Sequence, residues 1–146
     1  MKIEADKYCF ACGQENPIGL KLQFRLERRA DGGEEYVTEF TPRAEHQGYV
    51  GMTHGGIITT LLDEVTARLV WVKGIKAVTA KIEVRLRKPV PVETPVTVRG
   101  RIVQHRGKSL LATAEVYLPD NTVAAEATAT LLRVNNNGEQ GSRQNL

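Results

Sequence analysis

A single segment of the sequence carries the spacing of a long amphipathic helix. Across residues 55–72, apolar side chains recur every three or four positions and form one stripe, which comprises Ile58, Leu61, Leu62, Val65, Leu69 and Val72. Gly74 follows this segment and is expected to end the helix. Because one helix cannot bury such a stripe alone, the rest of the chain must supply a sheet against which it packs.

Six other segments have the patterns of strands. Residues 20–28 alternate apolar and polar side chains, and residues 34–41 resume a strand pattern after a Gly-containing turn, which predicts a hairpin. Beyond the helix, strand patterns return four times, separated by turn residues, at 78–88, 95–105, 109–118 and 122–134. The predicted fold is α+β, in the order β-β-α-β-β-β-β, with an antiparallel sheet wrapped around one long helix.

Length and composition limit the chain to one folded domain. It has 146 residues, of which 41% are hydrophobic and 25% charged, as is typical of globular proteins. Its net charge of 20 − 17 = +3 lacks the clustering that nucleic-acid binding requires. Charged residues interrupt the most apolar segment, and the first ten residues lack the apolar core of a signal peptide. We therefore expect a cytoplasmic protein with no nucleic-acid or membrane partner.

Two terminal segments differ from the predicted domain at residues 20–134. Residues 1–19 form an N-terminal extension that contains Cys9 and Cys12, and residues 135–146 form a polar tail that is expected to be disordered. One C-x-x-C pair supplies two ligands, whereas zinc takes four. A structural role in the N-terminal turn is favoured for the two cysteines, ahead of a zinc site shared with other groups and of redox activity, and no metal site is assigned.

The segment that leads into the helix could carry chemistry. Gly55 and Gly56 begin the helix, where free N–H groups and the helix dipole suit an oxyanion or a polarised carbonyl. The alternative is that they only permit a tight turn. Asp63 is predicted on the helix face away from the sheet, either as a reactive carboxylate or as a solvated acid. Glu64 is expected to form an ion pair with Arg68.

These residues resemble the hot-dog-fold acyl-CoA thioesterases, in the branch with a His-Gly-Gly motif typified by phenylacetyl-CoA thioesterase. The motif stands here as His54-Gly55-Gly56, and Asp63 follows the histidine by nine residues. Thr79 precedes Pro89 by ten residues, which also matches the family pattern. The N-terminal C-x-x-C segment is similar to an extension in one subgroup of these enzymes.

The resemblance implies a role for each matching residue. The N–H of Gly55 would polarise the thioester carbonyl, and Asp63 would act as general base or nucleophile. Thr79 would orient the water or the acid, and His54 would position the loop or touch the thioester. Many members carry Asn or Gln six residues before the histidine, where this chain has Gly48. The neighbouring Gln47 is the candidate replacement.

Helix geometry adds a prediction about assembly. Gly56 and Asp63 lie seven residues apart, or about 10 Å along a helix, which is too far for both to act on one carbonyl carbon. If both act on one thioester, they come from different chains. We therefore expect a homodimer with antiparallel helices and shared active sites; a tetramer of two such dimers is left open.

The phosphates of coenzyme A would need basic neighbours, and no cofactor is expected apart from coenzyme A as part of the substrate. The candidates are Arg85, Arg87, Lys88, Arg106 and Lys108, with a solvated basic surface as the alternative. The sequence predicts hydrolysis of an acyl-CoA thioester, and the alternative function is an acyl-CoA binding or sensing protein without catalysis. A hydratase of the same fold ranks lower, and the pattern leaves the acyl group undefined.

Overall fold

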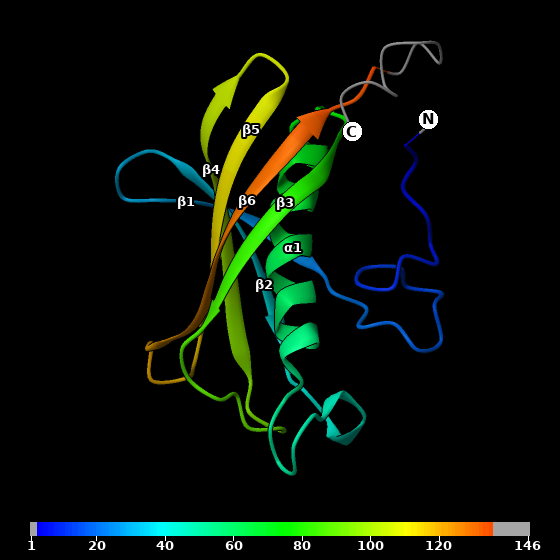
Figure 1. The fold of residues 1–146 in the computed structure, drawn as a ribbon, viewed down its shortest axis with the longest axis vertical. Helices are drawn as coiled ribbons and strands as arrows, with labels where there is room; N and C mark the ends of the chain where they lie inside the picture. Colours follow the sequence, from blue (N-terminus) through cyan, green and yellow to red (C-terminus); the bar gives the residue numbers. More distant parts are fainter. Residues whose placement is uncertain (1–2, 136–146) are drawn as a thin grey trace.

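A six-stranded antiparallel sheet curves around one long helix in the computed structural model, which describes residues 3–135 (Figure 1). The sheet order is β1-β2-β4-β5-β6-β3. The helix is α1 (Gly55–Val72), and the strands are β1 (Phe24–Arg28), β2 (Glu34–Phe40), β3 (Ala77–Leu86), β4 (Val96–Arg106), β5 (Ser109–Tyr117) and β6 (Val123–Arg133). The predicted element order and fold class are confirmed. The predicted tail, from residue 136 onward, lies outside the described residues.

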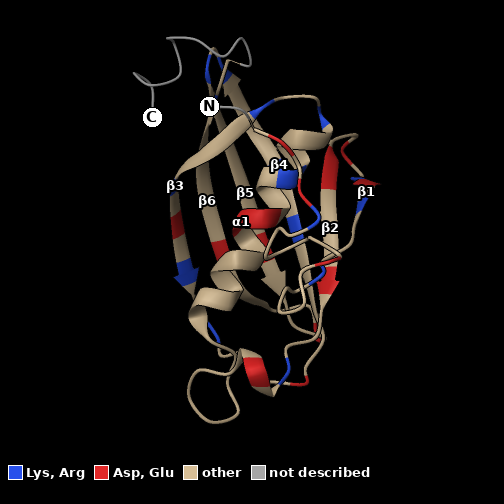
Figure 2. Ribbon diagram, turned by 90° about the vertical axis from the view of Figure 1, so that its right-hand side faces the viewer, with Lys and Arg blue, Asp and Glu red and all other residues tan. Residues whose placement is uncertain are grey.

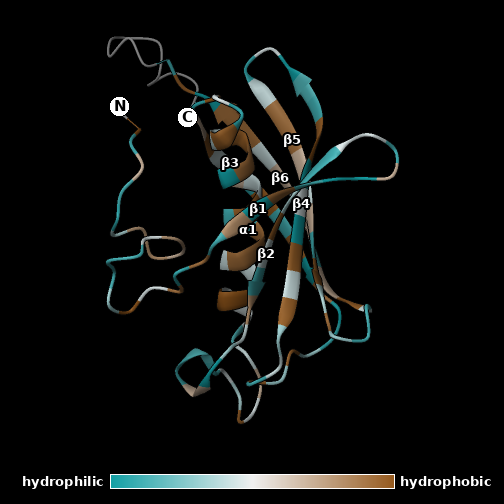
Figure 3. Ribbon diagram, turned by 180° about the vertical axis from the view of Figure 1, so that it is seen from behind, coloured by the Kyte–Doolittle hydropathy of each residue, from teal (hydrophilic) through white to brown (hydrophobic). Residues whose placement is uncertain are grey.

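The core forms between the concave face of the sheet and the apolar stripe of α1. Leu61, Leu62 and Val65 are fully buried there. Gly100 on β4 lets the helix approach the sheet closely, because a Cβ at this position would lie 2.9 Å from Val65 Cγ1. Hydrophobic residues concentrate on α1 and the central strands, whereas the loops at the ends are mostly hydrophilic (Figure 3). No helix within residues 3–135 has both the length and the apolar character of a membrane span.

The first strand is shorter than its alternating sequence predicts. It begins at Phe24 rather than at residue 20, because Lys21 adopts a left-handed backbone conformation with φ of 53° that interrupts extended structure. The predicted buried face also ends early, since the side chain of Leu26 is 50% exposed. The alternation of residues 20–28 therefore reports two different environments rather than one strand.

Residues 20–22 pack with the N-terminal extension instead. The N–H of Leu20 donates to the carbonyl oxygen of Phe10, and the N–H of Leu22 donates to that of Ala11. Leu20, Leu22 and Ala11 are all buried in the main core. The extension thus lies over the side of α1 that faces away from the sheet, and it gives the molecule a third layer (Figure 1).

Strand β3 forms one edge of the sheet and carries a β-bulge. Within residues 3–135 it pairs with β6 alone, and the pairing register shifts between Thr79 and Lys81. Bulges increase local twist and redirect side chains, and Thr79 at this bulge contacts α1 through Asp63. In the connection between α1 and β3, Gly74 has φ of 79° and ends α1 as predicted.

Candidate active site

A cavity of about 740 Å³ opens at the N-terminal end of α1. This volume is within the range of small-molecule binding sites. Most of its wall is apolar and comes from Met52, Ile58, Leu86, Pro89, Val90 and Ala125. Its polar groups include the predicted site residues Gln47, His54, Gly55, Arg87 and Lys88. The structure therefore brings five of the predicted residues to one apolar cavity.

The start of α1 presents one uncommitted N–H group to this cavity. His54 is the N-cap residue, and its Nδ1 accepts a hydrogen bond from the N–H of Gly56 at 2.8 Å. The N–H groups of Ile57 and Ile58 both donate to the carbonyl oxygen of His54. Within residues 3–135 the N–H of Gly55 has no acceptor. Of the two glycines, Gly55 is thus free to bind a ligand oxygen, whereas Gly56 serves the cap.

The packing of the loop before the helix explains why glycine occupies position 48, where many family members carry Asn or Gln. A Cβ on Gly48 would lie 3.2 Å from His54 Cα, so a larger residue would press against the N-cap. The neighbouring Gln47 lines the cavity, and its Oε1 accepts a hydrogen bond from the N–H of Gly51 at 2.8 Å. This bond fixes the amide group and leaves its NH₂ as the donor available to a ligand.

Asp63 and Thr79 meet at the flank of the helix. The hydroxyl of Thr79 donates to Asp63 Oδ1 at 2.7 Å, although the two residues lie 16 positions apart. Helical spacing predicted that Asp63 points away from the sheet. In the structure it is half-buried instead. The reason is that the curved sheet carries its edge strand β3 around to the flank of α1. One carboxylate oxygen is held by Thr79, and the other has no hydrogen-bond partner in the described chain.

The cavity and the Asp63–Thr79 pair lie apart within one chain. Neither Asp63 nor Thr79 lines the cavity. Gly55 and Asp63 lie eight positions apart on one continuous helix, which corresponds to about 12 Å of rise. A single chain therefore does not bring the free N–H and the carboxylate to the same ligand atom.

The predicted basic residues divide between the two ends of the molecule. Arg87 and Lys88 line the cavity, whereas Arg85 does not. The hydrogen bond between Arg87 and Glu126, at 2.6 Å, raises the pKa of the arginine and lowers that of the glutamate. Arg106 and Lys108 flank the β4–β5 turn, at the opposite end of the molecule from the loop before α1 (Figure 1).

A cluster of basic residues surrounds this second end. Lys108 lines a separate hollow of about 450 Å³ together with Lys76 and Arg133. The structure therefore does not bring Arg106 and Lys108 to the cavity of their own chain.

The charged residues of α1 lie in its middle (Figure 2), and the two cysteines approach the helix there, at Glu64. Cys9 Sγ donates to Glu64 Oε1 at 3.7 Å, and both cysteines are free thiols. Burial, followed by the nearby Glu64 carboxylate, raises the pKa of the Cys12 thiol well above its ordinary value. Glu64 thus faces the extension, and the expected ion pair with Arg68 is wrong: no such pair occurs in the described part of the chain.

Several cavity residues escaped the sequence reasoning. Tyr49, Met52, Leu86 and Val90 belong to loops or a strand end and form no periodic pattern. The N–H of Thr53 donates to the carbonyl oxygen of Val90, which joins the two loops into one wall. Tyr49 and Met52 lie in the segment before the helix that the sequence singled out, and Val90 lies in a predicted turn, but neither signal specifies which segments face each other.

The comparisons with known proteins agree with this architecture. The family model of the thioesterase superfamily matches residues 50–125, just over half of the chain. The chain therefore belongs to the thioesterase superfamily, and its fold is the hot-dog fold of that family.

Individual relatives are more distant. The acyl-coenzyme A thioesterase THEM4 of Mus musculus is 29% identical over 89 residues, which cover 60% of this chain and 38% of the relative. The chain thus spans less than half the length of this curated relative. A solved thioesterase superfamily protein is 24% identical with a TM-score of 0.76, over 86% of this chain and 60% of the other. A hypothetical thioesterase of Streptococcus pneumoniae, solved with coenzyme A, is 20% identical with a TM-score of 0.68, over 77% and 86%.

Proposed function

We propose that the protein is an acyl-CoA thioesterase, which hydrolyses its substrate to a free acid and coenzyme A. The observation that carries this proposal is the uncommitted N–H of Gly55 on the wall of an apolar cavity. Membership of the thioesterase superfamily and the similarity to an acyl-coenzyme A thioesterase support the reaction class. The Streptococcus pneumoniae structure with coenzyme A supports the ligand class.

Each group has a defined part in the proposed reaction. The Gly55 N–H donates to the thioester carbonyl oxygen, and the positive end of the helix dipole stabilises the charge that develops there. The free oxygen of Asp63 takes a proton from water while the water oxygen bonds to the carbonyl carbon. The carbon–sulfur bond then breaks, and the coenzyme A thiolate leaves and takes up that proton. Direct attack by Asp63 on the carbonyl is the covalent variant of this scheme.

Three further residues support these roles. Thr79 occupies one oxygen of Asp63, so the other oxygen is directed toward the water or the carbonyl. His54 positions the helix start through its bond to Gly56 and adjoins the thioester in the cavity. The NH₂ of Gln47 is the proposed replacement for the donor that other members place at the position of Gly48.

We infer that the working unit is a homodimer in which Gly55 of one chain and Asp63 of the other form each site. The separation of about 12 Å within one helix supports this arrangement. The outer edge of β3 has no neighbouring strand in the described part of the chain, which makes it a surface for pairing with a second copy. Tyr49 and Val50 beside the cavity are 85% and 93% exposed, and a second chain would cover them.

The basic residues fit the same arrangement. Arg87 and Lys88 line the cavity and are proposed to bind phosphates of coenzyme A, with Arg85 nearby on β3. Antiparallel helices would bring the second end of one chain, with Arg106 and Lys108, toward the cavity of its partner. Both ends of the molecule would then contribute positive charge to one ligand.

Substitution of Asp63 by Asn tests the proposal. Asn retains the shape and an oxygen that accepts from Thr79, but it cannot take a proton from water. We expect kcat to fall by at least about 100-fold, while the thermal midpoint stays close to that of the wild type. The measurement is release of free thiol from aryl, short, medium and long acyl-CoA substrates. Hydrolysis at the wild-type rate by this variant would refute the role of Asp63.

The same panel separates an enzyme from a binding protein. If the wild type binds acyl-CoA in calorimetry but releases no thiol from any substrate, the chain is a binding or sensing protein. Shared sites are tested by mixing subunits that carry Asp63→Asn with subunits that carry Gly55→Pro. One of the two sites in such a heterodimer contains both intact groups, so partial recovery of activity is expected.

A further inference from the structure

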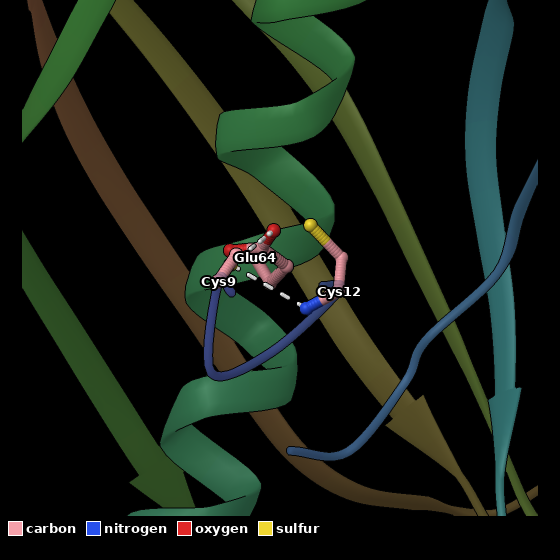
Figure 4. A group of neighbouring side chains, drawn as sticks. All are labelled: Cys9, Cys12 and Glu64. Atoms are coloured by element: carbon pink, nitrogen blue, oxygen red, sulfur yellow. Dashed lines mark hydrogen bonds between the residues drawn. The ribbon is translucent and has the colours of Figure 1, made fainter. Parts of the chain in front are cut away.

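Three potential metal ligands converge between the N-terminal extension and α1. The sulfur atoms of Cys9 and Cys12 and a carboxylate oxygen of Glu64 all lie within 4.8 Å of one another (Figure 4). All three residues are half-buried, so the group is neither a solvated surface cluster nor sealed from ions. The sequence favoured a structural turn for the cysteines because it offered only two ligands. The fold supplies the third from a helix 55 residues further along the chain.

The C-x-x-C turn is already shaped to direct both sulfurs to one side. The N–H of Cys12 donates to Cys9 Sγ at 3.4 Å, and the N–H of Gly13 donates to the carbonyl oxygen of Cys9 at 2.8 Å. Gly13 is required by this turn, since a Cβ there would lie 2.3 Å from the carbonyl oxygen of Lys7. An N–H directed at a sulfur stabilises the thiolate form, which is the form that binds metals.

We propose that Cys9, Cys12 and Glu64 bind one zinc ion, with a fourth coordination position occupied by water. Two sulfurs and one carboxylate are ligands that zinc accepts, whereas magnesium and calcium prefer oxygen alone. Zinc–sulfur bonds of about 2.3 Å in a tetrahedron place two sulfurs about 3.8 Å apart. Side-chain rotations that shorten the longest separation by at most about 1 Å therefore close the site around the ion.

On the same helix, Arg68 would provide compensating charge for the proposed site. Two thiolates, one carboxylate and Zn²⁺ sum to a single negative charge, and Arg68 lies one helical turn beyond Glu64. Its Nε is buried and bonds to nothing in the described chain.

Such a site would fasten the extension to the helix. Metal that binds only the folded state adds its binding free energy to folding. The position of the metal matters because Glu64 follows Asp63 directly. The zinc ion would hold the turn of α1 that also carries the proposed catalytic carboxylate, and its presence does not depend on whether the chain is a hydrolase.

The test measures zinc directly on the full chain. The protein is purified under reducing conditions, its zinc content is determined by mass spectrometry, and Zn²⁺ is titrated back against a chromophoric chelator after removal of metal. We expect one ion per chain in the wild type and none retained by Cys9→Ser or Cys12→Ser. Glu64→Gln should bind zinc at least about 10-fold more weakly, because substitution of residues that only hydrogen-bond to metal ligands already lowers metal affinity by that factor.

A matched control and a spectroscopic signature make the result specific. Glu15→Gln removes a carboxylate from the same extension, where Glu15 only faces the exposed Lys7, and should bind zinc as the wild type does. Cobalt substituted for zinc should give thiolate-to-metal absorption in the wild type that is lost in both cysteine variants. The proposal is overturned if the metal-free wild type takes up no zinc. It is equally overturned if Glu64→Gln binds zinc as tightly as Glu15→Gln.

Discussion

Replacing Gly55 by Pro deletes a single N–H group and leaves the helix start in place. Proline is favoured at the first helical position, where its missing N–H breaks no helical hydrogen bond. The preceding residue must be extended, and His54 has φ of −60° and ψ of 134°. The new Cβ would meet Leu86 Cδ1 at 2.9 Å, but this atom is the end of a flexible side chain. The substitution therefore removes the proposed carbonyl-binding donor, and the ring Cδ takes the place of its hydrogen.

The structure sets the size of the expected effect. No other N–H at the start of α1 can replace that of Gly55, because Gly56 donates to His54 Nδ1 and the next two N–H groups donate to the His54 carbonyl oxygen. Loss of one donor to an oxyanion costs about 100- to 1,000-fold in kcat, or about 2.7–4 kcal/mol. We expect Gly55→Pro to fall in this range.

Gly55→Ala is the matched control, since it adds the same Cβ against Leu86 but keeps the N–H. Both variants are assayed by release of free thiol from the best acyl-CoA substrate, with circular dichroism and thermal midpoints as checks of folding. The informative quantity is the ratio of the two kcat values, in which any effect of the Leu86 contact cancels. Equal turnover by the two variants would refute the role of the Gly55 N–H.

Three further predictions follow from individual contacts. Thr79→Val should lower kcat by about 10- to 150-fold, because a hydrogen bond to the charged Asp63 is lost, whereas Thr79→Ser should retain most activity in the thiol assay. His54→Ala should reduce the free energy of unfolding by about 0.5–2 kcal/mol in urea denaturation through loss of the N-cap bond, and His54→Asn should restore it; equal stability of the two would contradict the cap. A hydrogen bond from Arg99 holds the pKa of Glu27 below its ordinary value of 4.5, so the stability that this carboxylate contributes is present above that value and is lost as the pH falls through the folded-state pKa. In urea denaturation, the free energy of unfolding should therefore fall more for the wild type than for Glu27→Gln as the pH drops below about 4.5. Parallel pH profiles of the two proteins would count against the ion pair.

Predictions from local patterns agreed with the structure wherever one environment governs a whole segment. The stripe of α1 is buried from Ile58 to Leu69, so helical spacing located those side chains and both ends of the helix; Val72, predicted as the last member of the stripe, is 47% exposed, because it lies in the final turn. Residues 20–28 failed this condition, because their first part bonds to the extension and only their last part pairs with β2. Alternation indicates burial on one side, but it does not indicate which partner provides that burial.

The sequence by itself determined the single helix, the surrounding strands, and the spacing that sets Asp63 and Thr79 apart from ordinary polar residues. Tertiary structure decided which groups each side chain meets. The curved sheet and the bulge in β3 bring Thr79 to Asp63, and the folded extension brings Cys9 to Glu64 in place of Arg68. The spacing of residues along the chain predicts side-chain partners only a few positions apart. Partners from distant segments depend on how far the sheet twists and where the backbone turns.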